Sequence, residues 1–205
     1  MMRSDELVMR VFLPSFFVAY LLIGYTYTVW SAKKKYGIEP HEIRQRHPIM
    51  ELGERYRNAI FGVILLMTFG YALFPSLNAY VGPIAFLQVP IIRAVGIAVL
   101  IGSLVLLRLS QRALKGSWRV GFDLASEPTE LITSGLYARS RNPIYVGMTA
   151  TAVGLFLALP NAITLTVASL VFLLLQVRIL VEEEYLEHVH GEAYRSYRQG
   201  TPRWL

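Results

Sequence analysis

Long apolar runs dominate the chain and alternate with short polar segments. A membrane-spanning helix needs about 20 predominantly apolar residues. Three separate stretches meet this requirement, at roughly 8–30, 58–79 and 89–109. A further apolar block, 143–181, is about twice as long as one span and is interrupted by Pro160-Asn161. Because proline breaks a helix, this block predicts two closely paired spans in a helical hairpin, which brings the total to about five.

The polar segments between these runs carry their charge unevenly. The segment after the first run and the connection after the third are rich in Lys and Arg, whereas the links near 77–83 and 160–161 carry no charge. Cytoplasmic loops are enriched in Lys and Arg, so we expect the basic segments and the C-terminus to face the cytoplasm and the N-terminus to lie outside. The basic positions are Lys33, Lys34, Lys35, Arg44, Arg46, Arg55 and Arg57 in the first segment, and Arg112, Lys115, Arg119, Arg139 and Arg141 in the second.

Composition agrees with a membrane protein. Of 205 residues, 54% are hydrophobic and 17% are charged, against about 25% charged in soluble domains. The predicted fold class is all-α: a polytopic integral membrane protein with a C-terminal helical hairpin and a cytoplasmic C-terminal segment. We expect a single membrane domain over 1–205, with three N-terminal spans in 1–110 and a cofactor-binding connection, hairpin and tail in 111–205. Basic loops account for the net charge of +6 without a nucleic-acid partner.

Several kinds of chemistry lack the residues that they require. The chain contains no Cys, which excludes disulfides, thiolate metal sites and Cys nucleophiles. No Gly-rich loop follows a strand in 115–137, so a Rossmann cofactor site has no support there, although Trp118 is suited to stacking on a flat group. The four histidines show no metal-binding spacing and no catalytic metal is expected; they are His41, His47, His188 and His190.

The stretch "GLYARSRNPIYVGM" places a basic turn at the start of an apolar run. Asn142 is a good N-cap residue, and Pro143 suits the first helical turn because its missing N–H has no intrahelical partner there. The free N–H groups of that turn, beside Arg139 and Arg141, suit an anionic group. An equally simple interpretation is a capped membrane helix whose arginines reach lipid phosphates.

A second candidate site lies at the inner end of the last run. Arg178 and Glu182 are four residues apart, which places them on one helix face, and an Arg at this depth is costly unless it is paired or functional. Glu183 and Glu184 point elsewhere around the helix, so all three carboxylates cannot enter one pocket. The tail beyond them interleaves Tyr185, Tyr194, Tyr197 and Trp204 with Arg195, Arg198 and Arg203, a pattern also typical of membrane-interface anchors.

These two segments together resemble a known family. "GLYARSRNPIYVG" is similar to the G-x-Y…R-[HN]-P-x-Y-x-G signature of the isoprenylcysteine carboxyl methyltransferases and related phospholipid methyltransferases. "EEEYLEHVHGEAYRSYRQGTPRW" is similar to that family's E-E-x-x-L…F-G-x-x-Y-x-x-Y…P tail. The resemblance covers roughly 112–205, with Asn142 where many members have His and His190 where Phe usually stands.

The resemblance implies an integral-membrane methyltransferase that uses S-adenosylmethionine without a Rossmann domain. Its cofactor pocket would be closed by the C-terminal segment, and a lipophilic or prenylated acceptor would enter from membrane lipids. Arg178 and Glu182 would be catalytic, with a carboxyl O-methyltransferase favoured because no general base is evident. The positions that match the cofactor motif are Tyr137, Arg141, Asn142, Pro143, Tyr145, Gly147, Glu182 and Glu183.

Two other functions remain open. Membrane sterol reductases have a similar C-terminal pattern and use NADPH, but they normally contain more spans, and five spans leave little room for a sterol pocket and a nucleotide site. A non-catalytic membrane scaffold would retain the fold without turnover. The resemblance favours a bacterial or archaeal cell membrane as the location, or the endoplasmic reticulum membrane in a eukaryote.

Overall fold

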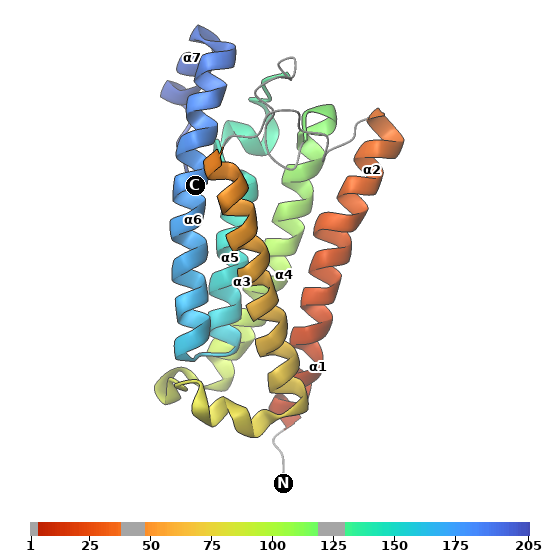
Figure 1. Cartoon of the computed structure of the whole chain (residues 1–205), viewed down its shortest axis with the longest axis vertical. Coiled ribbons are helices and arrows are strands. Elements are labelled where there is room, and N and C mark those ends of the chain that lie inside the picture. Colours follow the sequence, from red (N-terminus) through yellow and green to blue (C-terminus); the bar gives the residue numbers. More distant parts are fainter. Residues whose placement is uncertain (1–3, 38–47, 119–129) are drawn as a thin grey trace.

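The computed structural model describes residues 4–37, 48–118 and 130–205. Within these ranges the chain is helical and makes five passes along the long axis of the molecule (Figure 1). The predicted positions His41, Arg44, Arg46, His47 and Arg119 lie outside the described residues. The elements are α1 (Ser4–Ala19), η1 (Tyr20–Thr26), α2 (Tyr27–Tyr36), α3 (Pro48–Leu73), η2 (Pro75–Tyr80), η3 (Ala85–Leu87), α4 (Pro90–Ala113), η4 (Lys115–Ser117), η5 (Gly135–Ala138), α5 (Pro143–Ala158), α6 (Ala162–His190) and α7 (Glu192–Gly200).

The predicted all-α membrane fold is confirmed. In the part of the chain that the structure describes, four helices are long and apolar enough to cross a membrane: Glu6–Tyr36, Glu51–Leu73, Pro90–Ala113 and Ala162–His190. The remaining pass, α5, has 16 residues, or about 24 Å at 1.5 Å per residue, which is less than the roughly 30 Å of a hydrocarbon core. It pairs with α6 in the predicted hairpin, which turns at Pro160 and Asn161.

The second span was predicted too far along the chain. The expected range 58–79 runs past Leu73, whereas α3 starts at Pro48 and ends before Pro75. Pro75 has no N–H to donate and ends the helix there. At the other end of α3, the more polar residues 48–57 are part of the helix. Arg55 and Arg57, which were expected in a loop, therefore belong to α3.

The two ends of the bundle differ in charge. One end, here called the tail end, carries η4, η5 and α7, and the other, the hairpin end, carries η2, η3 and residues 159–161 (Figure 1). Segment 74–89 at the hairpin end contains no charged residue, whereas Lys33, Lys34, Lys35, Arg112 and Lys115 lie at the tail end. This asymmetry is the one that the sequence indicated, and the cytoplasmic placement of the tail end stays a prediction.

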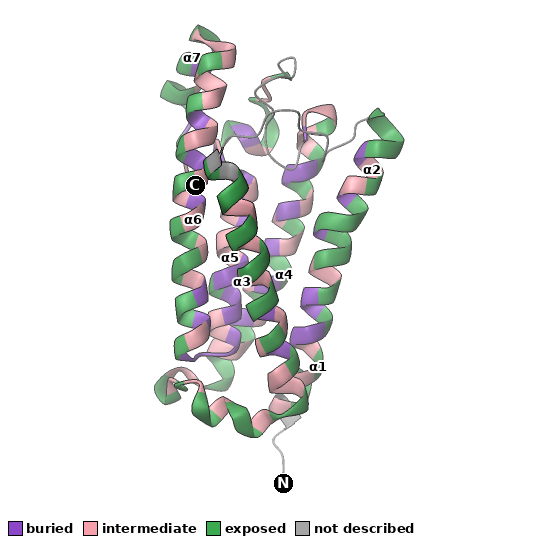
Figure 2. Ribbon diagram, viewed as in Figure 1, coloured by how far each residue is buried: buried purple, intermediate pink, exposed green. Residues whose placement is uncertain are grey.

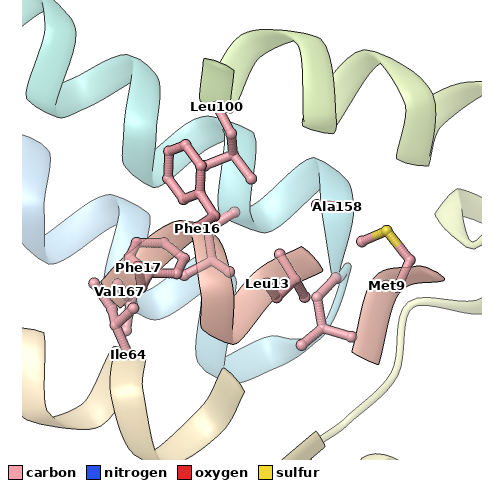
Figure 3. Packing of buried hydrophobic residues seen from close by; sticks show 10 residues of the cluster. Met9, Leu13, Phe16, Phe17, Ile64, Leu100, Ala158 and Val167 are labelled. Atoms are coloured by element: carbon pink, nitrogen blue, oxygen red, sulfur yellow. The ribbon is translucent and has the colours of Figure 1, made fainter. Parts of the chain in front are cut away.

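Apolar packing is concentrated toward the hairpin end. One buried cluster joins α1, α3, α4 and α6 to residues of α5, and its members include Leu13, Phe17, Ile64, Leu100 and Val167 (Figure 3). The outer faces of the helices are exposed along much of their length (Figure 2), and they carry large apolar side chains such as Leu66, which is 74% exposed. In a bilayer these faces contact lipid, so their exposure is consistent with the membrane assignment.

A polar clamp joins the first helix to α4. Between α1 and α2 the helix widens into the π-helical segment η1, where the usual backbone pairing is disturbed. Gln111 Nε2 donates to the Gly24 carbonyl at 2.7 Å, and Gln111 Oε1 accepts from Thr28 Oγ1 and Arg108 Nη1, each at 2.9 Å. The clamp provides partners for groups that hydrocarbon would leave unsatisfied.

Helices α4 and α5 pack with their backbones close together because glycines face the partner helix. A Cβ placed on Gly96 would lie 2.5 Å from the Ala158 backbone nitrogen, and one on Gly154 would lie 3.0 Å from that of Leu100. Small residues at such contacts favour association of membrane helices. A hydrogen bond of 2.8 Å between the Ser103 and Thr151 hydroxyls crosses the same interface.

We expect Gly96→Ala to destabilise the protein because its new methyl group would meet backbone atoms that cannot move independently. Overpacking of this kind costs about 1–3 kcal/mol, so the thermal unfolding midpoint in detergent should fall. Gly102→Ala on the same helix is the matched control, since a Cβ there meets nothing within 4 Å, and Ala has a helix propensity about 1 kcal/mol better than Gly. Equal midpoints for the two variants would contradict the close α4–α5 packing.

Candidate functional site

A cavity of about 910 Å³ extends from the tail end into the bundle, where it reaches the buried apolar cluster. Its apolar part is lined by residues that include Phe17 and Ile64, which also belong to the buried cluster, and by Phe61 and Val171. Its polar part is lined by charged side chains from α6 and from the turn before α5: Arg141, Arg178, Glu182 and Glu183. One cavity therefore presents an apolar wall and a charged wall to whatever it binds.

Arg178 and Glu182 lie together, as their spacing predicts, and Tyr145 joins them. Arg178 Nε donates to the Tyr145 hydroxyl at 2.8 Å, and that hydroxyl donates to Glu182 Oε2. Tyr145 is in the first turn of α5, so this contact fixes the start of α5 against the inner end of α6. The cost of an arginine at this depth is reduced because it is hydrogen-bonded and lies near a carboxylate.

Glu183 makes a second, separate cluster of charges. It was expected to point away from Glu182, yet it also lines the cavity, and only Glu184 among the three is exposed. Glu183 Oε1 accepts from Arg141 Nη2 at 2.8 Å, and Oε2 accepts from Arg203 Nη2 at 2.7 Å. The side chains of Glu183 and Arg141 are only 6% and 8% exposed, so this is a buried pair with a second arginine at its edge.

The C-terminal tail is held against the turn before α5 by hydrogen bonds that its backbone carbonyls accept. Arg141 N donates to the Pro202 carbonyl at 2.9 Å, and Arg141 Nη1 donates to the Arg198 carbonyl at 2.9 Å. Trp204 stacks on Phe172 of α6 with ring centroids 6.0 Å apart. The tail thus folds back on the bundle, and its helix α7 contributes to the cavity lining, whereas the sequence alone left open a tail of interface anchors.

The cap predicted at Asn142 is wrong in one respect. Asn142 occupies the N-cap position and Pro143 the first helical position of α5, but the Asn142 side chain makes no capping hydrogen bond. Its amide Nδ2 instead donates to the Arg203 carbonyl at 3.1 Å. Because that amide holds the tail, the first N–H groups of α5 do not receive the side-chain partner that was expected.

The residues carried over from the family motif separate into two groups. Tyr137, Arg141, Asn142, Tyr145, Arg178, Glu182 and Glu183 line the cavity. Pro143 and Gly147 are buried away from this lining. A Cβ on Gly147 would lie 3.3 Å from the backbone of Ser103 and Leu107, so this glycine allows α5 to approach α4 instead of facing a ligand.

Two tail residues were missed as part of the site. Tyr194 and Tyr197 line the cavity from α7, and the Tyr197 hydroxyl donates to the Tyr137 carbonyl at 2.6 Å. Burial raises the pKa of Tyr197 to about 12, so the hydroxyl stays protonated at neutral pH. The signal in the sequence is the Y-x-x-Y spacing, which puts both rings on one face of a short helix.

Two other expectations concern metals and stacking groups. Among the residues that the structure describes, no group of His, Cys, Asp and Glu could hold a metal ion. Trp118 lines the cavity and packs beside Ala32 of α2. Its stacking on a flat group, which the sequence suggested, stays a prediction.

Comparison with known proteins identifies relatives of this site. The sequence model of the phospholipid methyltransferase family matches residues 91–193, which run from α4 through the first motif segment and into the second, and end at the start of α7. A protein-S-isoprenylcysteine O-methyltransferase from Schizosaccharomyces pombe (strain 972 / ATCC 24843) is 38% identical over 73 residues. That stretch is 35% of this chain and 31% of the relative's length.

We expect Glu183→Ala to destabilise the fold. The substitution leaves Arg141 buried without its carboxylate, and removal of one partner from a buried ion pair costs about 3–5 kcal/mol. Glu184→Ala, at the exposed neighbouring position, is the matched control and should change stability by less than about 0.5 kcal/mol. Thermal unfolding of both detergent-purified variants tests this, and a Glu183→Ala midpoint equal to that of the control would refute the structural role of the pair.

Proposed function

The chain belongs to the phospholipid methyltransferase family, and we propose that it transfers a methyl group from S-adenosylmethionine to the carboxylate of a lipophilic acceptor. The observation that carries this proposal is the single cavity with one charged and one apolar wall. Methyl transfer brings a cofactor with charged groups next to an acceptor with an apolar body, and one cavity with both kinds of wall can hold the two together.

The residues of the charged wall fit S-adenosylmethionine, which has a carboxylate, an ammonium and a sulfonium group. Glu182 supplies a carboxylate for a cation, and Arg141 and the start of α5 supply donors for an anion. Aromatic side chains on the same lining, among them Trp118, suit the flat adenine ring. The cavity volume of about 910 Å³ lies within the roughly 300–1,000 Å³ that is typical of ligand pockets.

The acceptor is inferred from Arg178 and the apolar wall. A guanidinium forms paired hydrogen bonds with carboxylates, and Arg178 lines the cavity beside the start of α5. The apolar wall offers Phe17, Phe61 and Val171 to a hydrocarbon chain. The relative from yeast is named for an isoprenylcysteine substrate, which combines a carboxylate and an apolar chain.

The chemistry assigned to these residues is mainly orientation. When bound, S-adenosylmethionine supplies an activated methyl group. Arg178 would hold the acceptor carboxylate in line with it, and the tail would exclude water from the charged wall. Transfer to a carboxylate removes no proton, so this assignment requires no general base. The basic tail end would face the cytoplasm under the positive-inside rule.

Titration calorimetry with S-adenosylhomocysteine, and with NADPH in parallel, tests the cofactor. We expect the detergent-purified protein to bind S-adenosylhomocysteine saturably and not NADPH. Binding of NADPH alone would favour a reductase, and binding of neither by folded protein would favour a scaffold. Labelled methyl transfer to a farnesylated cysteine, with phosphatidylethanolamine vesicles as the second acceptor, then tests the carboxylate. Transfer to the amine alone would overturn the acceptor assignment and keep the reaction class.

We expect Glu182→Gln to weaken S-adenosylhomocysteine binding by about tenfold or more, because a charged hydrogen bond to the ligand ammonium is lost. Glu184→Gln is the matched control on the same turn of α6 and faces away from the cavity. Calorimetric affinities of the two variants give the comparison. If Glu182→Gln binds as tightly as Glu184→Gln, Glu182 is not a cofactor ligand.

A further inference from the structure

Two buried hydrogen-bond donors in the cavity wall have no partner. Among the described residues, the buried side-chain polar atoms that lack one are Arg10 Nε, Arg141 Nε, Thr149 Oγ1 and Tyr194 Oη. Of these, Arg141 and Tyr194 line the cavity. The Arg141 side chain is 8% exposed and Tyr194 is 1% exposed. Buried polar groups are nearly always paired in folded proteins, so the two orphans on this wall indicate a missing partner.

The chemistry of the two atoms restricts that partner. A guanidinium Nε–H is a donor and never an acceptor. Burial raises the pKa of the Tyr194 hydroxyl and nearby Glu183 raises it further, whereas Arg141 lowers it, so the hydroxyl keeps its proton and is available to donate. Tyr194 and Arg141 line the same cavity, together with Glu183. Two donors on one lining, one of them cationic, match an anionic acceptor such as a carboxylate.

Glu183 does not supply this acceptor, and it is poorly placed to bind a ligand cation. Its two carboxylate oxygens already accept from Arg141 Nη2 and from Nη2 and Nε of Arg203. An ammonium that approached Glu183 would meet both guanidinium groups and be repelled. Glu182 lines the same cavity, and its Oε2 accepts from the Tyr145 hydroxyl, which separates it from Arg178. Because no guanidinium donates to it directly in the described contacts, Glu182 is the carboxylate left for a ligand cation.

We propose that the Tyr194 hydroxyl and Arg141 Nε bind the carboxylate of the amino-acid end of S-adenosylmethionine, while Glu182 faces its ammonium. The tail therefore contributes a ligand-binding side chain to the cavity. This inference rests on the proposed function. It gives a ligand-binding role to Tyr194, which lies just beyond the residues that match the family model.

Tyr194→Phe tests the proposal because it removes only the hydroxyl. We expect the affinity for S-adenosylhomocysteine, measured by calorimetry, to fall by about ten- to a hundredfold, as for a lost hydrogen bond to a charged group. The unfolding midpoint of the ligand-free protein should stay the same or rise, because the variant no longer buries an unpaired polar atom. If the Tyr194 hydroxyl instead had a partner within the protein, its removal would lower the unfolding midpoint.

Tyr197→Phe is the control for the direction in which the unfolding midpoint changes. It lies on the same helix face and loses a hydroxyl that does have a partner, the Tyr137 carbonyl at 2.6 Å. Its ligand-free midpoint should therefore fall. A midpoint that fell equally in both variants would show that the Tyr194 hydroxyl has a structural partner, and would overturn the proposal.

A ligand without the carboxylate locates the contact. In decarboxylated S-adenosylhomocysteine the aminopropyl group keeps its ammonium, so the unmodified protein and Tyr194→Phe should bind it with affinities within about twofold of each other. A loss that persisted with this ligand would place the hydroxyl against another part of the molecule and overturn the assignment. If Tyr194→Phe bound S-adenosylhomocysteine as the unmodified protein does, only this inference would fail. If the folded unmodified protein did not bind it, the proposed function would fail as well.

Discussion

The geometry of the charged wall depends on the ion pair between Glu183 and Arg141, to which Arg203 is added. Electrostatic interactions strengthen as the effective dielectric constant falls, and both side chains of the pair are almost fully buried. Three segments meet at this one carboxylate: the inner end of α6, the turn before α5 and the C-terminal tail. Because each charge would be unpaired if a segment moved away, the three segments are held together, and the cavity wall acquires a fixed arrangement of donors and acceptors.

Helix length explains why this cluster lies where it does. At 1.5 Å per residue, α5 with 16 residues is much shorter than α6 with 29. Because the hairpin turn aligns the two helices at one end, α5 begins part way along α6, and α6 extends beyond it toward the tail end. The glycines of α4 and α5 keep this short helix close to α4. Tyr145 and Arg141 thereby reach Glu182 and Glu183, whereas a full-length α5 would have carried them beyond the bundle.

Features that depend on local composition were predictable. The apolar runs and the Pro160-Asn161 break identified the spans and the hairpin, and the spacing of Arg178 and Glu182 placed them on one face. Features that depend on distant partners were not. Arg203 pairs with Glu183 across 20 residues, and its carbonyl draws the Asn142 amide away from the cap. The end of α3 at Pro75 was missed because hydropathy continues across it, although the proline itself marks the boundary.

The two adjacent glutamates show why a motif does not by itself assign roles. Neighbouring residues on a helix point about 100° apart, since each turn contains 3.6 residues, so Glu182 and Glu183 meet different neighbours. Glu183 forms ion pairs with two guanidinium groups, whereas Glu182 accepts from a tyrosine hydroxyl that in turn accepts from Arg178. Under the proposed function their identical side chains have different roles: Glu183 holds three segments together, and Glu182 faces the ligand. The sequence could place both at the site, but only their partners in the fold separate the two.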